Sequence, residues 1–549
     1  MLFIAMFALQ FSGRAEAARA SRGMVVTAQH LATEVGVKIL KQGGNAVDAA
    51  VAVGYAEAVV NPCCGNIGGG GFMLLHLKEH GDVVINFRET APRASTPDMY
   101  LDASGNPVPN SSLFGYKAVG VPGTVLGLDE ALRRFGRLSR KQVMAPAIRL
   151  AREGYTLIKG DTDILHATTD RFRSDPELAK IFLRPDGNPL QPGDRVVQPD
   201  LARTLEGISR DGPDFFYRGP VAKAIAAAAR SGGGVIREAD FAEYRLGKAE
   251  PLRCTYRGYV FVSVPPPSSG GVALCEMLNI LEGYDLKGLG FHSVPATRVM
   301  VEAMRHAYAD RNDSLGDPDV VDNPVERLLS KDYAASVRDQ INGMQKQTAR
   351  LQPEREKAET THYSIIDEDG NAASVTYTLN GSFGALVMAP GTGVLLNDEM
   401  DDFTVKAGVP NQFGLVQGNR NAVAPGKRPL SSMSPTIVLK DGKPFLVLGS
   451  PGGSRIITAT LEAAINVIDY GLSPQAAVDA PRIHYQGQPD TVFIEPGALT
   501  PQVRSELEKL GYRFIEQPPW SAVELVAVKR GTVIGANDSR RPAGAASGY

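Results

Sequence analysis

The chain has 549 residues, 43% of them hydrophobic, and its 58 basic and 60 acidic side chains leave a formal charge of −2. This length can bury a large core in two to four domains, and no run of 18 apolar residues predicts a membrane span. The charge is balanced, without a long basic run or basic and aromatic residues interleaved, which argues against a nucleic-acid-binding protein. A small molecule or a peptide is the expected partner.

The N-terminus has some features of a secretion signal. Residues 2–9 are apolar, and 14–17 have the small-x-small form of a signal-peptidase site. The apolar run is too short to cross a membrane, and no basic residue precedes it, so the true start lies upstream or this is an alternative start codon. We therefore predict a signal peptide or its remnant over 1–17, and a periplasmic or secreted protein.

Two helices and a glycine-rich segment follow. Residues 27–42 are typical of a capped helix closed by Gly43-Gly44, and Asn45 caps a second, apolar helix that ends at residues 61–62. An apolar helix of this kind should be buried. The four glycines at 68–71 open a strand, whereas a phosphate-binding loop would precede a helix and carry Lys-Ser or Lys-Thr. The sequence therefore does not predict a nucleotide site.

The remaining elements alternate between helices and strands. Strands are predicted at 72–77 and 83–87, and the region 121–341 is mainly helical apart from a strand pair near 256–264. The C-terminal third has a different pattern, with strands at 361–366, 373–378, 436–439 and 445–448 and a helix at 454–470. The first two of these strands flank a polar turn and predict a hairpin. A two-layer sheet between layers of helices would accommodate them.

The four cysteines fit poorly with a disulfide framework. Cys63 and Cys64 are adjacent and cannot easily bridge each other, while Cys254 and Cys275 lie in separate strand-like and helix-like segments. A bridge between Cys254 and Cys275 is left open. We expect buried free thiols.

Thr360 stands at the start of a predicted strand, directly after a polar and charged segment, 345–359. Such a segment is suited to cleavage. A hydroxyl is a poor nucleophile, but a free α-amine on the same residue can activate it as a general base. Cleavage before Thr360 would supply that amine. The alternative is that Thr360 and Thr361 are ordinary β-branched residues at the start of a strand.

A glycine-containing turn, 449–455, joins a buried apolar strand to a helix. The N–H groups of its glycines could bind an oxyanion. The alternative is that the glycines only permit a tight strand-to-helix turn.

Polar clusters near this predicted sheet suggest a seat for an α-amino acid end. Residues 397–402 place four carboxylates in five positions, which suits an ammonium group. Residues 427–435 supply paired hydroxyls with basic neighbours, and Arg88 could add a bidentate clamp, which together suit a carboxylate. The alternative for each cluster is a solvated loop or a surface salt bridge.

Five motifs together resemble the γ-glutamyltranspeptidases, the glutathione hydrolase proenzymes, within the N-terminal-nucleophile hydrolase superfamily. The motifs are 360–364, 376–380, 400–403, 428–436 and 449–455, and the match runs along essentially the whole chain after the leader. The resemblance implies an α/β (α+β) fold, a four-layer αββα sandwich formed jointly by two subunits. Cleavage between Glu359 and Thr360 would give a large subunit, 18–359, and a small catalytic subunit, 360–549.

The resemblance also implies a role for each residue that matches a motif. Thr360 would be the nucleophile and, through its new α-amine, the base. Thr378 would orient it, and the amides of Gly452 and Gly453 would form the oxyanion hole. The substrate's α-carboxylate would be bound by Arg88, Ser431 and Ser432, and its α-ammonium by Asn380, Glu399 and Asp402.

The reaction implied is attack of Thr360 on the γ-amide of glutathione and related compounds, with release of cysteinylglycine. The γ-glutamyl ester would then pass to water or to an amino acid or peptide acceptor. No cofactor is implied. No metal site is expected, because the eight histidines show no ligand spacing, and His362 is as consistent with a structural role as with a catalytic one.

Two positions depart from the pattern of many relatives. Residues 406–418 resemble the family's active-site lid, but Phe413 stands where many relatives have tyrosine and cannot donate a hydroxyl hydrogen bond to Asn380. We therefore expect a looser lid with easier access for water or bulky acceptors. Glu399 stands where some relatives carry glutamine, and its carboxylate should strengthen ammonium binding.

Two other functions are open. Some members of the family deacylate glutaryl-cephalosporins, but glutaryl groups lack the α-amine, so the set Asn380, Glu399 and Asp402 favours γ-glutamyl compounds. From another class, a periplasmic amino-acid-binding protein could use the same polar clusters as a ligand seat without chemistry. Such a protein would remain a single uncut chain.

Overall fold

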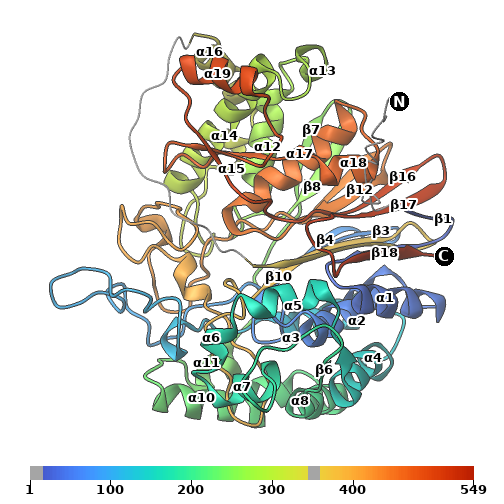
Figure 1. The fold of residues 1–549 in the computed structure, drawn as a ribbon, viewed down its shortest axis with the longest axis vertical. Coiled ribbons are helices and arrows are strands. Elements are labelled where there is room, and N and C mark those ends of the chain that lie inside the picture. Colours follow the sequence, from blue (N-terminus) through green and yellow to red (C-terminus); the bar gives the residue numbers. More distant parts are fainter. Residues whose placement is uncertain (1–16, 344–358) are drawn as a thin grey trace, which may run out of the picture.

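The computed structural model describes residues 17–343 and 359–549 (Figure 1). Nearly all of the predicted signal peptide and of the connector 345–359 lies outside these ranges. Two antiparallel sheets pack face to face in the middle of the molecule, and helices cover both outer faces (Figure 1). The predicted four-layer αββα sandwich is therefore confirmed.

The first sheet has six strands and holds the predicted catalytic hairpin. Its strands, in spatial order, are β18 (Ala545–Gly548), β2 (Met24–Thr27), β9 (Thr361–Ile366), β10 (Ala372–Thr378), β3 (Gly70–Leu77) and β4 (Gly81–Asn86). Every residue of β9 and β10 is buried. Both faces of these central strands are covered, one by the second sheet and one by helices, so polar and apolar residues alike lie inside.

The second sheet has seven strands. In spatial order they are β1 (Ala18–Ala20), β17 (Thr532–Asn537), β16 (Glu524–Lys529), β12 (Lys443–Gly449), β11 (Thr436–Lys440), β8 (Tyr259–Ser263) and β7 (Leu252–Tyr256). The strand pair predicted near 256–264 is thus confirmed and forms one edge of this sheet. Both sheets combine strands from before and after residue 360, so the two predicted subunits would share one core.

Apolar side chains from both sheets fill the space between them. Val26 and Leu74 come from the first sheet, and Ile437, Val447 and Val526 come from the second. Burying such side chains is worth roughly 1.5–3 kcal/mol each. Apolar packing therefore holds the two sheets together independently of the peptide bond between residues 359 and 360.

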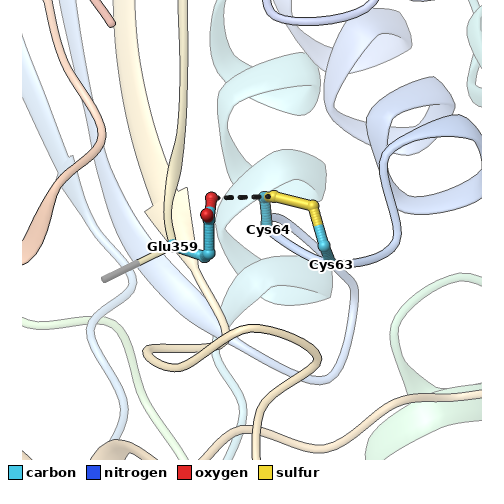
Figure 2. A group of neighbouring side chains, drawn as sticks. All are labelled: Cys63, Cys64 and Glu359. Carbon is cyan, nitrogen blue, oxygen red and sulfur yellow. Dashed lines mark hydrogen bonds between the residues drawn. A yellow bond between two sulfur atoms is a disulfide. The ribbon is translucent and has the colours of Figure 1, made fainter. Parts of the chain in front are cut away.

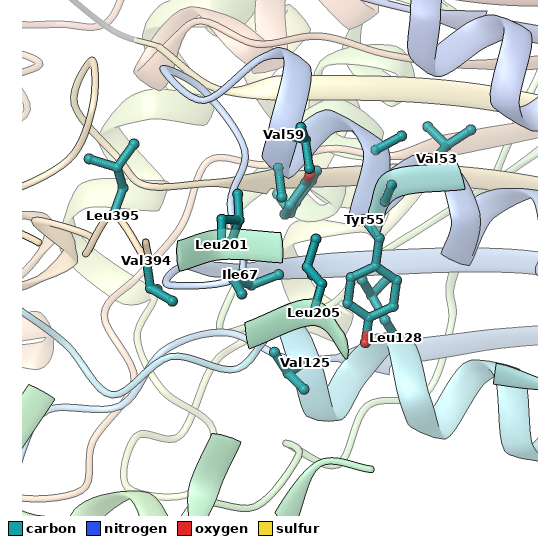
Figure 3. Packing of buried hydrophobic residues seen from close by; sticks show 14 of the residues in the cluster. Val53, Tyr55, Val59, Ile67, Val125, Leu128, Leu201, Leu205, Val394 and Leu395 are labelled. Atoms are coloured by element: carbon teal, nitrogen blue, oxygen red, sulfur yellow. The ribbon is translucent and has the colours of Figure 1, made fainter. Parts of the chain in front are cut away.

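The helical layer beside the first sheet packs around the apolar helix predicted after Asn45. That helix is α2 (Ala46–Val60), fully buried and closed at its start by a capping box of Asn45 and Asp48. Its neighbours include α1 (His30–Lys41), α3 (Thr124–Phe135) and α4 (Arg140–Glu153), and α4 packs in turn on α8 (Pro199–Asp211). Tyr55 of α2 lies beside Leu128 of α3 and Leu205 of α8 in this core (Figure 3).

The first helix begins later than predicted. Thr27 belongs to β2, where it pairs with Tyr363. The residue that caps α1 is Gln29, whose side-chain oxygen accepts hydrogen bonds from the first N–H groups of the helix. Pairing in the sheet therefore overrides the capping signal of Thr27.

The other elements on this side are β5 (Tyr155–Thr156), α5 (Lys159–His166), α6 (Thr169–Phe172), α7 (Pro176–Phe182), β6 (Arg195–Val196), α9 (Asp214–Tyr217), α10 (Pro220–Ser231) and α11 (Glu238–Glu243).

The other outer layer covers the second sheet. It includes α12 (Gly270–Leu281), α14 (Val294–Ser314), α16 (Lys331–Gly343), α17 (Ile456–Ile468) and α18 (Pro474–Asp479), with the shorter α13 (Leu286–Leu289) and α15 (Val325–Leu328). A small three-stranded sheet with one helix completes it: β13 (Ile483–His484), β14 (Val492–Ile494), β15 (Phe514–Glu516) and α19 (Pro501–Lys509). No helix within 17–343 or 359–549 is both long and apolar enough to cross a membrane.

The expectation of free thiols is wrong. Cys254 of β7 is bonded to Cys275 of α12, because this helix packs directly on the strand and brings the two Cα atoms to 5.8 Å. Cys63 and Cys64 are bonded to each other in the turn after α2 (Figure 2). A bond between these adjacent cysteines was not expected from the sequence. The local turn of the chain brings their two sulfurs together.

Candidate active site

Thr360 lies directly before β9, in the middle of the six-stranded sheet, and is 5% exposed. Strands β9 and β10 pair with Tyr377 opposite Thr361, so the next position along sets Thr378 opposite Thr360. The two hydroxyl oxygens are 3.1 Å apart. The register of the predicted hairpin therefore brings the candidate nucleophile and the residue predicted to orient it together.

The Thr378 hydroxyl connects Thr360 to the peptide bond before it. Its oxygen accepts the N–H of Asn380 at 2.9 Å, and its proton is donated to the carbonyl oxygen of Glu359 at 3.0 Å. A hydroxyl has one proton and two lone pairs, so the remaining lone pair can accept the proton of Thr360. Thr378 thus contacts both the Thr360 oxygen and the Glu359 carbonyl, and its orienting role stays a prediction.

The side chain of Glu359 is also held. Its carboxylate forms an ion pair with Arg541, and its Oε2 lies 3.6 Å from Sγ of Cys64 (Figure 2). Cys63, Cys64 and Glu359 bring three atoms of metal-binding type close together. The two sulfurs are bonded to each other, however, so they offer no thiolate to a metal.

The glycine turn after β12 lies beside Glu359. Gly452 has φ +125° and lines the same cleft as Glu359, and a Cβ at this position would lie 2.1 Å from Oγ of Ser521. Gly453 has φ +55° and begins the short helix η4 (Gly453–Arg455), which leads into α17. Both the backbone conformation and the close approach at residue 452 therefore favour glycine. The oxyanion-binding role of these amides stays a prediction.

Arg88 and the predicted acidic cluster form one buried seat. The Arg88 guanidinium contacts the carboxylates of Glu399 and Asp402, and its Nε donates to the carbonyl oxygen of Pro429 at 3.1 Å. Glu399 and Asp402 belong to the short helix η2 (Glu399–Asp402). Arg88, predicted to bind a carboxylate, and the acidic residues, predicted to bind an ammonium group, are in direct contact.

This seat contains buried carboxylate oxygens that lack a hydrogen-bond partner among the described residues. Glu89 lies 3.6 Å from Arg88, and neither of its carboxylate oxygens has a hydrogen-bond partner among the described residues; nor does Oε2 of Glu399. Burial raises the pKa of Glu89 to about 7 and raises that of Glu399, while Arg88 opposes both shifts. Buried acceptors without donors are unfavourable. The seat is therefore suited to a ligand that brings a positive charge and several N–H donors.

Ser431 and Ser432 lie near a second buried arginine that the sequence argument did not single out. Nη2 of Arg311, at the end of α14, lies 3.4 Å from Oγ of Ser432, and its Nε donates to Oγ of Ser269. Burial lowers the pKa of Arg311 to about 10, and the nearby Asp402 opposes this shift. The Ser431 hydroxyl accepts the N–H of Met433 at 3.0 Å. Arg311 thus adds a cation beside the predicted carboxylate seat.

Asn380 links this seat to the nucleophile. Its N–H contacts Thr378, and its side-chain Nδ2 donates to the carbonyl oxygen of Asp398 at 3.1 Å. Asp398 directly precedes η2, which carries Glu399 and Asp402. Asn380 has φ +81°, a conformation that asparagine adopts more readily than most residues. A short hydrogen-bonded path therefore runs from Thr360 to the charged seat.

The lid segment 406–418 is hydrogen-bonded to the acidic segment through Gln412, the residue before Phe413. Gln412, not Phe413, contacts the acidic segment: its Nε2 donates to Asp398 at 3.1 Å and its N–H donates to Asp401 at 2.9 Å. Phe413 is 5% exposed, and its carbonyl accepts from Gln486. The looser lid expected from Phe413 stays a prediction, but Gln412 supplies a polar anchor that the sequence argument missed.

His362 has a structural environment. Nδ1 lies 2.8 Å from Oγ1 of Thr376, Nε2 lies 3.1 Å from Oγ of Ser364, and the ring abuts Gly449 of the second sheet. Burial lowers its pKa to about 3, so the ring is neutral. A neutral ring held between two hydroxyls in the sheet interface is suited to packing rather than to proton transfer at Thr360.

Glu57 of α2 lies under the start of β9 and predicts a pH-dependent stability. Its Oε2 accepts from Asn61 at 2.8 Å and from Thr361 at 3.3 Å, and burial raises its pKa from 4.5 to about 7. The folded state therefore binds this proton more tightly than the unfolded chain. The stability from Glu57 is complete below about pH 4.5 and falls as the pH rises to about 7, by about 3 kcal/mol in all.

We expect Glu57→Gln to stabilise the protein at pH 8 by as much as about 3 kcal/mol and to change little at pH 4.5. Urea unfolding at both pH values measures this, with exposed Glu34→Gln as the control that should have little effect at either. A larger gain at pH 4.5 than at pH 8 would contradict the assignment.

Part of this site, including Glu359 and Gly452, borders an open cleft of about 700 Å³. It is lined, among others, by Glu359, Gly381, Asp398, Gln412, Gly452, Arg455, Trp520 and Arg541. A threonine at the start of a central strand, in an αββα sandwich and beside a cleft, is the arrangement of an N-terminal-nucleophile hydrolase. Such enzymes attack an amide carbonyl with the side chain of their first residue.

Comparison with known proteins identifies the family. The family model described as gamma-glutamyltranspeptidase matches residues 32–548. A glutathione hydrolase proenzyme of Pseudomonas sp. (strain A14) is 54% identical, with 96% of this chain and 95% of that one covered, and one of Escherichia coli (strain K12) is 47% identical, with 97% and 92% covered. The chain belongs to the γ-glutamyltranspeptidase family and is an enzyme of that family.

A solved structure shares the whole fold. The crystal structure of cephalosporin acylase from Bacillus halodurans matches with a TM-score of 0.87 and 28% identity, and covers 100% of this chain and 99% of that one. The sequence is thus less similar to this acylase than to the two glutathione hydrolase proenzymes.

Proposed function

We propose that this enzyme cuts itself between Glu359 and Thr360 and then acts as a γ-glutamyltransferase and glutathione hydrolase. In the first step Thr360 Oγ attacks the Glu359 carbonyl carbon. The peptide C–N bond breaks, its nitrogen takes a proton and becomes the α-amine of Thr360, and an ester joins the two residues. Water then hydrolyses the ester, freeing the Thr360 hydroxyl and the Glu359 carboxylate. The hydrogen bond from Thr378 to the Glu359 carbonyl supports this route.

In the mature enzyme Thr360 Oγ would attack the γ-amide carbon of a γ-glutamyl compound such as glutathione. The new α-amine takes the hydroxyl proton and delivers it to the departing amine, so that cysteinylglycine leaves and a γ-glutamyl ester remains. The amides of Gly452 and Gly453 stabilise the oxyanion. Water, or the amine of an amino acid or dipeptide, then attacks the ester by the reverse sequence of proton transfers.

The observation that carries this proposal is the buried seat with its unpaired carboxylate oxygens, joined to Thr360 through Asn380. An α-ammonium brings three N–H donors and one positive charge, which suit Glu399, Asp402 and Asn380. The α-carboxylate would be bound by Arg88 with Ser431 and Ser432, and Arg311 adds a second cation there.

Glutaryl-cephalosporins fit this seat less well. A glutaryl group has the carboxylate but no α-ammonium, so it would leave the excess carboxylates of the seat without a partner. An uncut amino-acid-binding protein would have no use for the hydroxyl chain through Thr378.

We also propose that the protein is exported to the periplasm or secreted, because residues 1–17 resemble a signal peptide.

The experiment that tests the proposal is intact mass and N-terminal sequencing of purified, incubated protein, with turnover of a γ-glutamyl anilide and a glutaryl anilide on the same sample. We expect a fragment of residues 360–549, 190 residues and about 20 kDa, that begins Thr-Thr-His-Tyr. The γ-glutamyl anilide should be hydrolysed and the glutaryl anilide should not. A single uncut chain without turnover would refute the proposal.

A further inference from the structure

The disulfide between Cys63 and Cys64 lies in a turn that packs against the start of β9. The turn follows α2, and a Cβ added to Gly65 would lie 2.5 Å from Cγ2 of Thr361, so the turn and the strand are in close contact. The side-chain Nδ2 of Asn61 also donates to the Thr361 hydroxyl at 3.3 Å. The disulfide is therefore part of the packing around the candidate nucleophile.

Each sulfur of this bond faces an oxygen that can accept a hydrogen bond. Sγ of Cys63 lies 3.1 Å from Oδ1 of Asn61, and Sγ of Cys64 lies 3.6 Å from Oε2 of Glu359 (Figure 2). A disulfide sulfur has no proton to donate to these oxygens, whereas a thiol has one. The site can therefore hold the two thiols of the reduced pair as well as the disulfide.

A cavity of about 360 Å³ gives small molecules access to the disulfide. Of the two cysteines, Cys63 is the one that lines this cavity. The residues that line both the cavity and the open cleft beside Glu359 are Asp163, Ile164, Arg540 and Arg541. The two spaces therefore adjoin, and a cavity of this size can hold a small organic ligand. A molecule released in the cleft can thus reach the Cys63 side of the bond.

We propose that the Cys63–Cys64 disulfide is a thiol-exchange site, at which a small thiol such as cysteinylglycine becomes covalently attached to Cys63. The thiol gives up its proton, and its sulfur forms a disulfide with Sγ of Cys63. The bond between Cys63 and Cys64 breaks, and the sulfur of Cys64 leaves with the electron pair and takes up the proton. The protein then carries a mixed disulfide at Cys63 and a thiol at Cys64.

The surroundings favour attack at Cys63. The attacking species is a thiolate, and it would have to approach Cys64 past the carboxylate of Glu359, whereas Cys63 faces the neutral side chain of Asn61. Cys64 is the better leaving group, because its new thiol can donate to Glu359. The ion pair of Glu359 with Arg541 also places a positive charge close to the sulfur that leaves.

The proposed function supplies the thiol. Hydrolysis of glutathione releases cysteinylglycine in the adjoining cleft, and glutathione itself carries a thiol. The identity of the natural thiol thus rests on the proposed γ-glutamyl hydrolase activity, whereas the reactivity of the disulfide does not.

The test measures the opening of both disulfides in the native protein. Purified wild type is incubated with cysteinylglycine or with 2-mercaptoethanol, neither of which carries a γ-glutamyl group, then alkylated with N-ethylmaleimide and digested for mass spectrometry. Cys254–Cys275 is the internal control, because it joins β7 to α12 within an apolar core. We expect Cys63–Cys64 to open about tenfold faster or more, with cysteinylglycine attached at Cys63.

Two single variants locate the reactive sulfur. Cys64→Ser leaves Cys63 as a free thiol in the cavity wall, and Cys63→Ser leaves Cys64 as a free thiol beside Glu359. With the disulfide form of cysteinylglycine, a free thiol gives one mixed disulfide and releases one cysteinylglycine. We expect Cys64→Ser to be labelled about tenfold faster than Cys63→Ser, as measured by intact mass.

The outcomes separate this proposal from the proposed function. The exchange site is refuted if Cys63–Cys64 opens no faster than Cys254–Cys275, or opens only in urea. Faster labelling of Cys63→Ser than of Cys64→Ser would overturn the assignment of Cys63 as the sulfur attacked. Self-cleavage and turnover of γ-glutamyl-4-nitroanilide are measured on the same wild-type sample without added thiol. An uncut, inactive wild type whose Cys63–Cys64 bond still opens selectively would refute the proposed function and leave the exchange site standing.

Discussion

Thr360→Ala should give a folded protein that remains a single uncut chain and hydrolyses no γ-glutamyl anilide. The substitution removes the hydroxyl oxygen that we propose attacks the Glu359 carbonyl and then serves as the nucleophile of the mature enzyme. Removing a catalytic nucleophile lowers kcat by about 10⁴-fold to 10⁶-fold in hydrolases. Thr378 keeps its contacts with Asn380 and Glu359, so the fold around the site should persist.

A denaturing gel and intact mass measure the cleavage, and anilide turnover measures the activity. Thr361→Ala is the matched control, because Thr361 is the next residue along and contacts Glu57 rather than Thr378. It should cut itself at the same place. Thr360→Ser, which keeps a hydroxyl, should also be cut. A Thr360→Ala chain that still separates into two fragments would show that another group performs the cleavage.

Arg88→Lys should weaken substrate binding and leave self-cleavage unchanged. Lysine keeps the positive charge but cannot contact Glu399 and Asp402 together through a planar fork, and cannot bind a carboxylate in the same bidentate way. We expect kcat/KM for γ-glutamyl anilides to fall by about a hundredfold, mainly through KM. Among the described residues, no hydrogen bond joins Arg88 to Glu359, Thr360 or Thr378, so the chain should still cut itself completely.

The control is Arg93→Lys, an exposed arginine that pairs with Glu243 and should behave as the wild type. An uncharged residue at position 88 is a poorer test, because an unpaired buried carboxylate cluster can cost about 3–5 kcal/mol of stability. Steady-state kinetics on the cut protein give kcat and KM separately. An unchanged KM in Arg88→Lys would remove Arg88 from the substrate seat.

Much of the fold follows from local patterns. The capping box at Asn45 and the apolar run behind it predict α2, and the alternation around the turn 367–371 predicts the β9–β10 hairpin. Glycines 68–71 open β3 as expected. Each of these signals depends on residues within a few positions of one another. The start of α1 was predicted too early, because Thr27 pairs in the sheet with residues hundreds of positions away.

The sequence alone determines the local motifs of the site, which are a threonine at a strand start, a glycine turn, an acidic run and paired serines. Only the tertiary structure decided how they meet. Arg88 contacts Glu399 across 311 positions, and Arg541 reaches Glu359 across 182. Arg311 likewise reaches Ser432 across 121 positions, and Gln412 reaches Asp398 across 14. Long-range contacts of this kind depend on sheet register and helix packing, which bring together charges that no short pattern relates.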